Sequence, residues 1–246
     1  MALTPQDLER HRRHILLKEI GGPGLQKLQA AHVAIIGAGA LGGPCALYLA
    51  AAGCGRIDIH DDDAVDLSNL QRQVQFDADD IGLGKAARLA SRLNALDPSL
   101  SVRAIDRRFE AGDRPEGDLI IDATDNFETR FALNALAHES GRCLVSGAAT
   151  GWSGQVGVFA SGAEAGAPCY RCFVPEMPGD GEDCSTIGVV GAITGIVGAR
   201  MALEALKLIV AAGTPLIGRL WVFDGLAGEG RTVRLRPDPE CPVCSA

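Results

Sequence analysis

A glycine-rich turn between an apolar run and a helical stretch is the feature that most limits how this chain can fold. GAGALG, residues 37–42, fits the pattern G-x-G-x-x-G and directly follows the apolar residues 33–36. Glycines at these places let the backbone turn tightly and approach a phosphate, whose charge the following helix N-terminus favours. Asp61 lies 19 residues beyond Gly42, where an acid that binds a ribose belongs. The pattern predicts a site for NAD or ATP; the alternative is a turn that binds nothing.

The hydrophobic pattern around this turn alternates between strand-like and helix-like segments. A second strand is predicted at RIDIH, and DLIIDATD has the fully apolar centre of a buried parallel strand. Further strands are expected at LSVRAI and CLVSGAA, and helices at residues 41–53, 85–96 and 126–140, after a helix or two before Ala31. Such alternation predicts an α/β protein with a Rossmann-like, doubly wound and mostly parallel sheet.

The pattern changes after Gly154. GQVGVFA is strand-like, whereas residues 163–183 are rich in Gly, Pro and acidic residues and are predicted to form a loop. A long helix is expected over about 191–212, with strands near RLWVFDG and RTVRLR before the tail CPVCSA. These last strands are expected to extend the sheet in antiparallel fashion.

Composition limits the location and the partners of the chain. With 47% hydrophobic residues in a length of 246, it can bury the core of one domain. Its formal charge of −8 disfavours nucleic acid and anionic membranes as partners. The charged N-terminal stretch has no signal-peptide core, and glycines and charges interrupt the apolar run 187–213. We therefore expect a cytoplasmic protein.

Residues beyond the acid at position 61 favour ATP over NAD. SNLQRQ places Arg72 soon after Asp61, and Lys85 follows in GLGKAAR. Both cations suit a triphosphate better than a nicotinamide ring, which needs an apolar slot. Asp125 and Asn126 follow the end of a strand, where ligands bind in an open α/β sheet and a carboxylate can hold Mg²⁺. The alternatives are a surface ion pair for Arg72 and a helix N-cap role for Asp125.

Four of the eight cysteines form two close pairs, Cys169-x-x-Cys172 and Cys241-x-x-Cys244. Four thiolates suit a closed tetrahedral Zn²⁺ site, which would fasten the C-terminal tail to a loop in the middle of the chain. Ordinary thiols are the alternative. Cys184 stands in the polar stretch DGEDCSTIG and is expected to be exposed. The remaining cysteines fall in predicted helices or strands and are expected to be small buried hydrophobes: Cys45, Cys54 and Cys143.

A series of motifs runs along nearly the whole chain: RHRRHILLKEIGGPGLQKL, IIGAGALGG, DDDAVDLSNLQRQ, DATDNFETR, CYRC, ALEALKL and CPVC. In this order they resemble the ThiF/MoeB/HesA family, bacterial relatives of ubiquitin-activating enzymes. The resemblance implies a homodimeric enzyme that uses ATP and Mg²⁺ to adenylate the C-terminal glycine carboxylate of a small β-grasp sulfur-carrier protein ending in Gly-Gly. Pyrophosphate is the second product. A sulfurtransferase or a cysteine desulfurase would be a further partner.

The resemblance also implies roles for individual residues. Asp61 resembles the acid that binds ribose, and Asp125 resembles the acid linked to Mg²⁺. Arg13 resembles an arginine that reaches the ATP of the neighbouring subunit, and Cys184 resembles a loop cysteine proposed to take part in sulfur transfer. The implied ATP-binding residues are Gly37, Gly39, Ala40, Gly42, Asp61, Ser68, Asn69, Leu70, Gln71, Arg72, Lys85, Asp125 and Asn126. The implied catalytic residues are Arg13, Arg72, Lys85, Asp125 and Cys184.

The sequence departs from the family pattern in two places. The glycine loop usually reads GxGGLG, and Ala40 takes the place of the second glycine of the pair. Ala40 keeps its N–H, so only a backbone conformation forbidden to alanine would spoil the site. Gly84 stands before Lys85 where the family often has proline. Neither change is expected to disable the site.

We expect one domain over residues 1–246, with a helical arm (1–30), a nucleotide-binding core (31–150) and a carrier-binding, zinc-bearing part (151–246). The carrier itself stays open. CSTIGVVG around Cys184 slightly favours a thiamine-type carrier, whereas PLIGRL occurs as readily in the molybdopterin branch. The rival functions are an NAD-dependent oxidoreductase and a catalytically silent homologue that only binds the carrier. The first leaves both cysteine pairs unexplained, and the second has only Ala40 in its favour.

Overall fold

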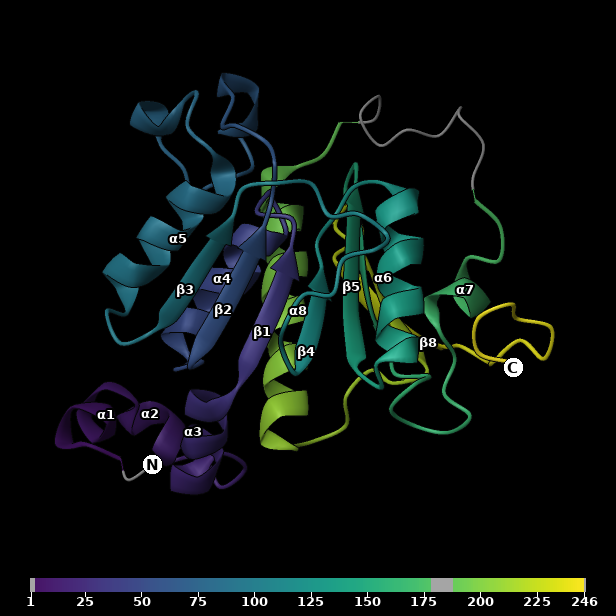
Figure 1. The fold of residues 1–246 in the computed structure, drawn as a ribbon, viewed down its shortest axis with the longest axis horizontal. Helices are drawn as coiled ribbons and strands as arrows, with labels where there is room; N and C mark the ends of the chain where they lie inside the picture. The colour runs from purple at the N-terminus through teal and green to yellow at the C-terminus, as the bar shows by residue number, and fades with distance from the viewer. Residues whose placement is uncertain (1–2, 178–187, 246) are drawn as a thin grey trace.

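The computed structural model describes residues 3–177 and 188–245 of the chain. Its strands form one mixed sheet in the order β3-β2-β1-β4-β5-β6-β7-β8 (Figure 1). The neighbours from β3 to β5 in this order are parallel, and β6, β7 and β8 continue the sheet in antiparallel fashion. The strands are β1 His32–Ile36, β2 Arg56–His60, β3 Ser101–Ile105, β4 Leu119–Asp122, β5 Cys143–Thr150, β6 Ser153–Phe159, β7 Arg219–Asp224 and β8 Glu229–Arg234. The predicted fold class is confirmed.

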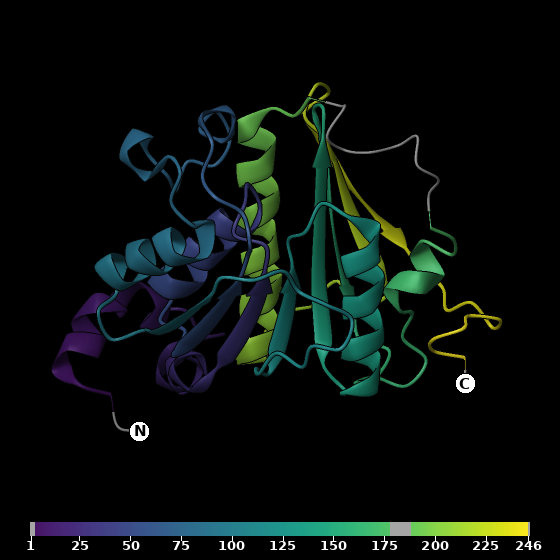
Figure 2. The ribbon, with the colours of Figure 1, turned by 45° about the horizontal axis from the view of Figure 1, so that its top comes forward.

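Helices cover both faces of this sheet (Figures 1 and 2). One face carries α4, α5 and α8, whose apolar side chains share a core with Ile35 and Ile57. The other face carries α6 and the short α7 around Ile36 and Ile120. The helices are α1 Pro5–Arg10, α2 Arg12–Ile15, α3 Gly21–Ala30, α4 Gly42–Ala51, α5 Lys85–Leu96, α6 Phe127–Glu139, α7 Tyr170–Phe173 and α8 Gly191–Val210, with 3-10 turns η1 Leu67–Asn69 and η2 Ala78–Asp80.

Sequence periodicity explains these elements. In α5, Ala86, Leu89, Ala90 and Leu93 recur at helical spacing, and all four are buried against the sheet. The helix has the predicted bounds. The strand Leu119–Asp122 is buried along its whole length, as its continuous apolar run predicts for a strand covered on both faces.

The order of the strands fixes where a ligand can bind. From β1 the chain passes to β2 and β3 on one side, and it then crosses to β4 and β5 on the other. The loops that leave β1 and β4 therefore diverge, and they open a crevice at the carboxyl ends of these strands. The glycine turn at 37–42 lies at this switch point.

Three segments differ from the sequence-based expectation. The N-terminal arm has three helices where one or two were expected. The segment 163–183, expected to be loop throughout, contains α7, because Tyr170 packs its ring against Phe159 and Phe173 in the core. The long helix α8 ends at Val210, because Ala211 adopts a left-handed conformation (φ 57°) that terminates it.

The long helix α8 carries a buried acid in an otherwise apolar face. Glu204 has no exposed surface, and it pairs with Arg200 (2.9 Å) and Lys207 (2.6 Å) one helical turn away on either side. Its second carboxylate oxygen accepts a hydrogen bond from the backbone N–H of Leu216 (2.9 Å), which precedes β7. Although α8 is long, it is not apolar enough to cross a membrane. No other helix in residues 3–177 or 188–245 is both long and apolar enough to do so.

We predict that Glu204→Leu destabilises the protein by about 2 kcal/mol, because it leaves two cations and a buried N–H without their partner. Urea denaturation would measure the change. Glu229→Leu on the exposed strand β8 is the matched control and should alter stability by no more than about 0.5 kcal/mol. Equal stability changes in the two variants would contradict this role of Glu204.

Candidate functional site

A cavity of about 650 Å³ opens at the carboxyl ends of the parallel strands. Its walls are the glycine turn after β1, the acidic run after β2, residues 108–109 after β3, the loop between β4 and α6, and residues 188–194. This size lies in the range of pockets that enclose a small-molecule ligand. The cavity lies at the switch point of the sheet and is lined by both basic and acidic side chains, among them Arg72, Lys85 and Asp125.

Two glycines of the turn are required by its backbone. Gly37 has a φ of +99°, and a Cβ there would lie 2.6 Å from the carbonyl oxygen of Ala123. A Cβ on Gly42 would lie 1.8 Å from the carbonyl oxygen of Gly37, so only glycine lets α4 begin against the turn. Gly39 and Ala40 line the cavity. Ala40 does not have a positive φ, so its conformation suits alanine and the departure from the family pattern is harmless.

Asp61 lies beside the glycine turn, as the spacing predicts. Its carboxylate accepts hydrogen bonds from the backbone N–H groups of Ala38 (2.6 Å) and Asp63 (2.9 Å). Burial raises the pKa of Asp61 above its usual value, and the two N–H donors and the Lys85 ammonium oppose that shift. Asp61 therefore fixes the turn and also lines the cavity.

The segment SNLQRQ forms a turn that folds back over the glycine loop. Gln71 and Arg72 line the cavity, and the hydroxyl of Thr194 at the start of α8 lies 3.5 Å from the carbonyl oxygen of Arg72. Asn69 shapes the turn, because its carbonyl oxygen accepts from the N–H groups of Arg72 and Gln73. The segment's other implied ATP-binding residues, Ser68, Asn69 and Leu70, stand in the turn and do not line the cavity.

Sequence reasoning missed Gln75, which clamps the glycine loop from outside. Its side-chain amide donates to the carbonyl oxygens of Ala38 (2.9 Å) and Gly39 (3.0 Å). Gly43 makes room for this side chain, since a Cβ there would lie 2.2 Å from the Gln75 amide. Gln75 lies just beyond SNLQRQ, and nothing in its local pattern reveals a partner nearly forty residues earlier.

Two of the cations that line the cavity were expected. The Arg72 guanidinium donates to the carbonyl oxygen of Ser68 (3.0 Å) and has no carboxylate partner within the described residues, so the surface ion-pair alternative fails. Lys85 is the first residue of α5, and its ammonium lies 2.7 Å from Asp63, with only 7% of the side chain exposed. The ion pair holds Lys85 at the cavity wall.

Two further arginines line the cavity and were not predicted. Arg108 lies in the loop after β3, which has no recognisable pattern, and Phe109 beside it packs edge-on against His60. Arg130 lies one turn into α6 and donates to the carbonyl oxygens of Thr124 and Gly147. Arg130 is the last residue of the motif DATDNFETR, so the motif could have indicated it.

The loop between β4 and α6 presents Asp125 to the cavity. Asp125 is exposed, and the N-cap of α6 is Asn126, whose side chain accepts from the N–H of Thr129 (2.9 Å). The N-cap alternative for Asp125 is therefore wrong. Buried Asp122 holds this loop by accepting from the N–H and hydroxyl of Thr124 and from Ser146.

Asp125 is the carboxylate of the cavity that could hold Mg²⁺ together with ATP. Within the described ranges, the cysteine cluster is the one group of three or more potential ligand side chains close enough to share an ion, so no cage of acids surrounds Asp125. Mg²⁺ commonly takes one or two carboxylates together with substrate phosphates. A single exposed carboxylate facing a loop of phosphate-binding type fits that pattern.

One of the implied catalytic residues, Arg13, does not line this cavity. Arg13 is exposed on α2, at the end of the sheet opposite to the arrowheads of the parallel strands (Figure 1). Cys184 lies outside the described residues.

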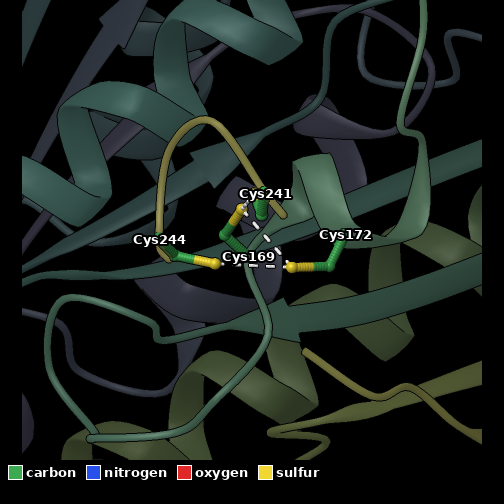
Figure 3. A group of neighbouring side chains, drawn as sticks. All are labelled: Cys169, Cys172, Cys241 and Cys244. Atoms are coloured by element: carbon green, nitrogen blue, oxygen red, sulfur yellow. Dashed lines mark hydrogen bonds between the residues drawn. The ribbon is translucent and has the colours of Figure 1, made fainter. Parts of the chain in front are cut away.

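The four cysteines of the two CxxC pairs meet beside α7, as Figure 3 shows. Their sulfur atoms lie within 4.8 Å of one another, with Cys169–Cys241 at 3.5 Å and Cys172–Cys244 at 3.4 Å. Disulfides need about 2.05 Å, whereas a tetrahedral zinc with Zn–S bonds of about 2.3 Å needs sulfur atoms about 3.8 Å apart. The cluster therefore has the donor set and spacing of a closed zinc site.

Neighbouring N–H groups point at two of these sulfur atoms. The side chain of Asn134 in α6 donates to Cys169 (3.5 Å), and the backbone N–H of Asp238 donates to Cys172 (3.3 Å). Asn134 also accepts from the N–H of Tyr170 (2.7 Å). Such outer contacts orient metal-binding thiolates. Here they join α6 to Cys169 and the tail to Cys172. Burial raises the pKa of Cys169 to about 11, and a cation would favour its ionised form.

The sequence model of the ThiF family matches residues 11–243. The chain is 40% identical to the SAMP-activating enzyme E1 of Haloferax volcanii, over 99% of this chain and 91% of that protein. It is also 40% identical to the sulfur carrier protein adenylyltransferase of Thermus thermophilus, over 99% and 93%. With the sulfur carrier protein ThiS adenylyltransferase of Escherichia coli, the identity is 40% over 98% and 97%.

Solved structures share the fold at lower identity. A crystal structure of E. coli MccB with MccA-N7isoASN superposes with a TM-score of 0.84 at 22% identity, over 97% of this chain and 75% of that one. The crystal structure of PaaA gives a TM-score of 0.80 at 21% identity, over 96% and 76%. The Rossmann-like sheet and its antiparallel extension are thus common to these proteins.

We predict that protein purified without chelators carries about one zinc ion per chain, measured by plasma mass spectrometry. Cys244→Ser should lose the ion and melt at a lower temperature, because metal binding to such a site contributes folding energy. Cys143→Ala, outside the cluster, is the matched control and should keep the ion. Finding no zinc in the unsubstituted protein would contradict the assignment.

Proposed function

This chain belongs to the ThiF family, and we propose that it adenylates the C-terminal glycine carboxylate of a small β-grasp sulfur-carrier protein. The chain is a nucleotidyltransferase. The observation that carries the proposal is the meeting of the glycine loop, Asp61, Arg72, Lys85 and Asp125 around one cavity. Relatives named as sulfur-carrier adenylyltransferases match it over almost their whole length.

The geometry supports one placement of ATP. The turn at 37–42 and the N-terminus of α4 would hold phosphates, and Asp61 would accept from the ribose. Arg72 and Lys85 would neutralise phosphate charge from the side of SNLQRQ and α5. Asp125 would hold Mg²⁺, which when bound neutralises phosphate charge and orients the leaving pyrophosphate.

The chemistry asks little more of the protein. A carboxylate oxygen of the carrier attacks the α-phosphorus, the bond to the bridging oxygen breaks, and that oxygen leaves with pyrophosphate. No protein base is needed, because the nucleophile is already ionised. His60 lines the cavity, but it is not placed to act as a base. Burial lowers the pKa of His60, and both of its ring nitrogens are buried without a partner. The site therefore works by positioning and charge stabilisation.

The far wall of the cavity suits a glycine tail. Ala148, Ala149, Gly188 and Val189 line it with small side chains, which leave room for an extended Gly-Gly segment. We propose a thiamine-type carrier ahead of a molybdopterin-type one, on the sequence around Cys184, which lies outside the described residues. A sulfurtransferase or cysteine desulfurase would act on the adenylate, with Cys184 as a candidate for that transfer. Zinc in the cysteine cluster and a cytoplasmic location complete the proposal.

A homodimer is part of this proposal. The solvent side of α8 carries an apolar stripe at helical spacing, with Ile196 41% and Leu203 46% exposed, and Tyr48 of neighbouring α4 is 58% exposed. A second copy seated there would cover the stripe. In such a dimer, Arg13 of one subunit would contact ATP bound in the cavity of the other. Helix α2, which carries Arg13, lies far from the cavity of its own chain (Figure 1).

The rival functions find little support. Arg72, Lys85, Arg108 and Arg130 line the cavity with charged groups, where a nicotinamide ring would need an apolar slot. The hypothesis of a silent carrier-binding homologue depended on Ala40. Because Ala40 has a backbone conformation that alanine adopts readily, it gives that hypothesis no support.

ATP–pyrophosphate exchange tests the proposal. Purified protein with Mg²⁺ receives in turn a thiamine-type and a molybdopterin-type carrier, each with an intact Gly-Gly end. We expect exchange that depends on the carrier and is faster with the thiamine type. Faster exchange with the other carrier would correct the branch, and no exchange with either would contradict the proposed reaction.

We predict that Asp125→Ala lowers the exchange rate by about 100-fold or more, because the metal and phosphates lose their carboxylate ligand. The variant should keep its melting temperature, since Asp125 is exposed and caps no helix. Glu128→Ala, an exposed acid in the next turn, is the control and should exchange normally. Normal exchange by Asp125→Ala would refute the assignment of the metal ligand.

A further inference from the structure

A row of polar side chains runs along one face of α6. Polar residues recur there at intervals of four, which places them on the same face of a helix: Asn126, Arg130, Asn134 and His138. Arg130 is 7% exposed and Asn134 is 2% exposed. Burying a polar side chain costs free energy unless it is hydrogen-bonded, so the bonds of these two residues show what the row joins.

The first part of the row belongs to the cavity. Asn126 and Arg130 both line it. The Arg130 guanidinium donates to the carbonyl oxygen of Thr124, in the loop that carries Asp125, and to that of Gly147 in β5. Arg130 thereby fixes the wall at which Asp125 would hold Mg²⁺ beside ATP.

The next residue of the row contacts the cysteine cluster. The side-chain N–H of Asn134 donates to the sulfur of Cys169 (3.5 Å), and its carbonyl oxygen accepts from the backbone N–H of Tyr170 (2.7 Å). Cys169 is the N-cap of α7, and Cys172 lies within this helix. One buried side chain on α6 thus holds a metal-binding sulfur and the start of the helix that carries a second one.

Helix α7 is too short to be stable by itself. It has four residues, and isolated helices shorter than about 12 to 15 residues are marginal in water. A metal bound by Cys169 and Cys172 would fix α7 at two points. Tyr170 and Phe173 of α7 line a small void together with Arg130. The placement of α7 therefore determines what lies next to an arginine of the cavity wall.

We propose that metal binding at the cysteine cluster and ATP binding in the cavity are coupled, and that Asn134 is the positioning residue that couples them. This inference rests on the proposed function, because it requires that the cavity bind ATP. Coupling between two binding equilibria is reciprocal. The metal therefore strengthens ATP binding, and ATP strengthens metal binding by the same factor.

The coupling follows from the contacts of α6 and α7. With its two cysteines fixed, α7 keeps Asn134 in place, and α6 presents Arg130 and the loop of Asp125 to ATP in one arrangement. Without the metal, α7 has other arrangements. ATP then binds only to the fraction of molecules that have the right one, so its apparent affinity falls.

The first test compares the Kd for ATP, with Mg²⁺ and no carrier, between zinc-loaded and zinc-depleted protein by titration calorimetry. We expect binding to be about 10-fold weaker in the depleted protein, a coupling of ordinary size. Equal Kd values in the two forms would overturn the proposal.

The second test uses only loaded protein and measures the zinc affinity by equilibrium competition with a chelator. Adding ATP and Mg²⁺ should raise that affinity by about the same 10-fold factor, because the coupling is reciprocal. An affinity that ATP leaves unchanged would overturn the proposal, even if the depleted protein of the first test does not fold.

The role of Asn134 is tested with Asn134→Leu, which is similar in size and removes both hydrogen bonds. We expect its zinc affinity to fall by about 10- to 100-fold. We also expect the effect of ATP on that affinity to fall to less than about 2-fold, because the link is lost. Asn134→Ser, whose side chain is too short to span both partners, should lose the effect in the same way.

The size of the ATP effect distinguishes coupling from a purely structural role. If Asn134 only stabilised the cluster, both variants would bind zinc more weakly and keep the parental ATP effect, and the role of Asn134 would be overturned. His138→Leu is the matched control. It lies one turn further along the row, contacts Ser161 (3.0 Å) on the side away from the cavity, and should keep the full effect.

The two levels of inference fail differently. If the zinc-loaded protein binds no ATP, the proposed function fails and the coupling fails with it. If the loaded protein binds ATP and its affinity does not depend on the metal, only the coupling is overturned.

Discussion

The hydrogen bonds on the two sides of Ala38 hold the site together. Its N–H donates to Asp61 at the end of β2, and its carbonyl oxygen accepts from Gln75 beyond SNLQRQ. The glycine turn is thereby fixed to the segment that follows Asp61. This explains why a polar, arginine-bearing segment comes directly after that acid: it returns to the glycine loop and brings Arg72 to the cavity wall. The loop, its acid and its cations form one unit.

The sequence predicted the features of the fold and the site that depend on local pattern. The glycine spacing, the helix 85–96 and the paired cysteines are short-range signals, and each of them indicated the right element. Gln75 was missed because its contacts join residues far apart in the chain, and Arg108 was missed because the loop after β3 has no recognisable pattern. The N-cap of α6 could be assigned to Asp125 or to Asn126 from the residues alone, and only the backbone geometry decides for Asn126.

The cysteine cluster is connected to the cavity through one helix. Asn134 contacts Cys169 and Tyr170 near the middle of α6, while Asp125 and Asn126 stand at the start of the same helix. A metal that fixes the tail would therefore also fix the end of α6 that lines the cavity. The C-terminal tail contributes no side chain to the cavity. Its attachment to the middle of the chain would instead stabilise α6, which lines the cavity.

Intact-mass spectrometry of the carrier would detect adenylation of its C-terminus directly. The chain, ATP and Mg²⁺ are mixed with a carrier that ends in Gly-Gly, and the reaction is stopped in acid before the mixed anhydride hydrolyses. We expect the carrier to gain the mass of one adenylyl group, and a carrier lacking its last glycine to gain nothing. A carrier that gains a single phosphoryl group, or adenylyl transfer that ignores the terminal glycine, would contradict the proposed adenylation.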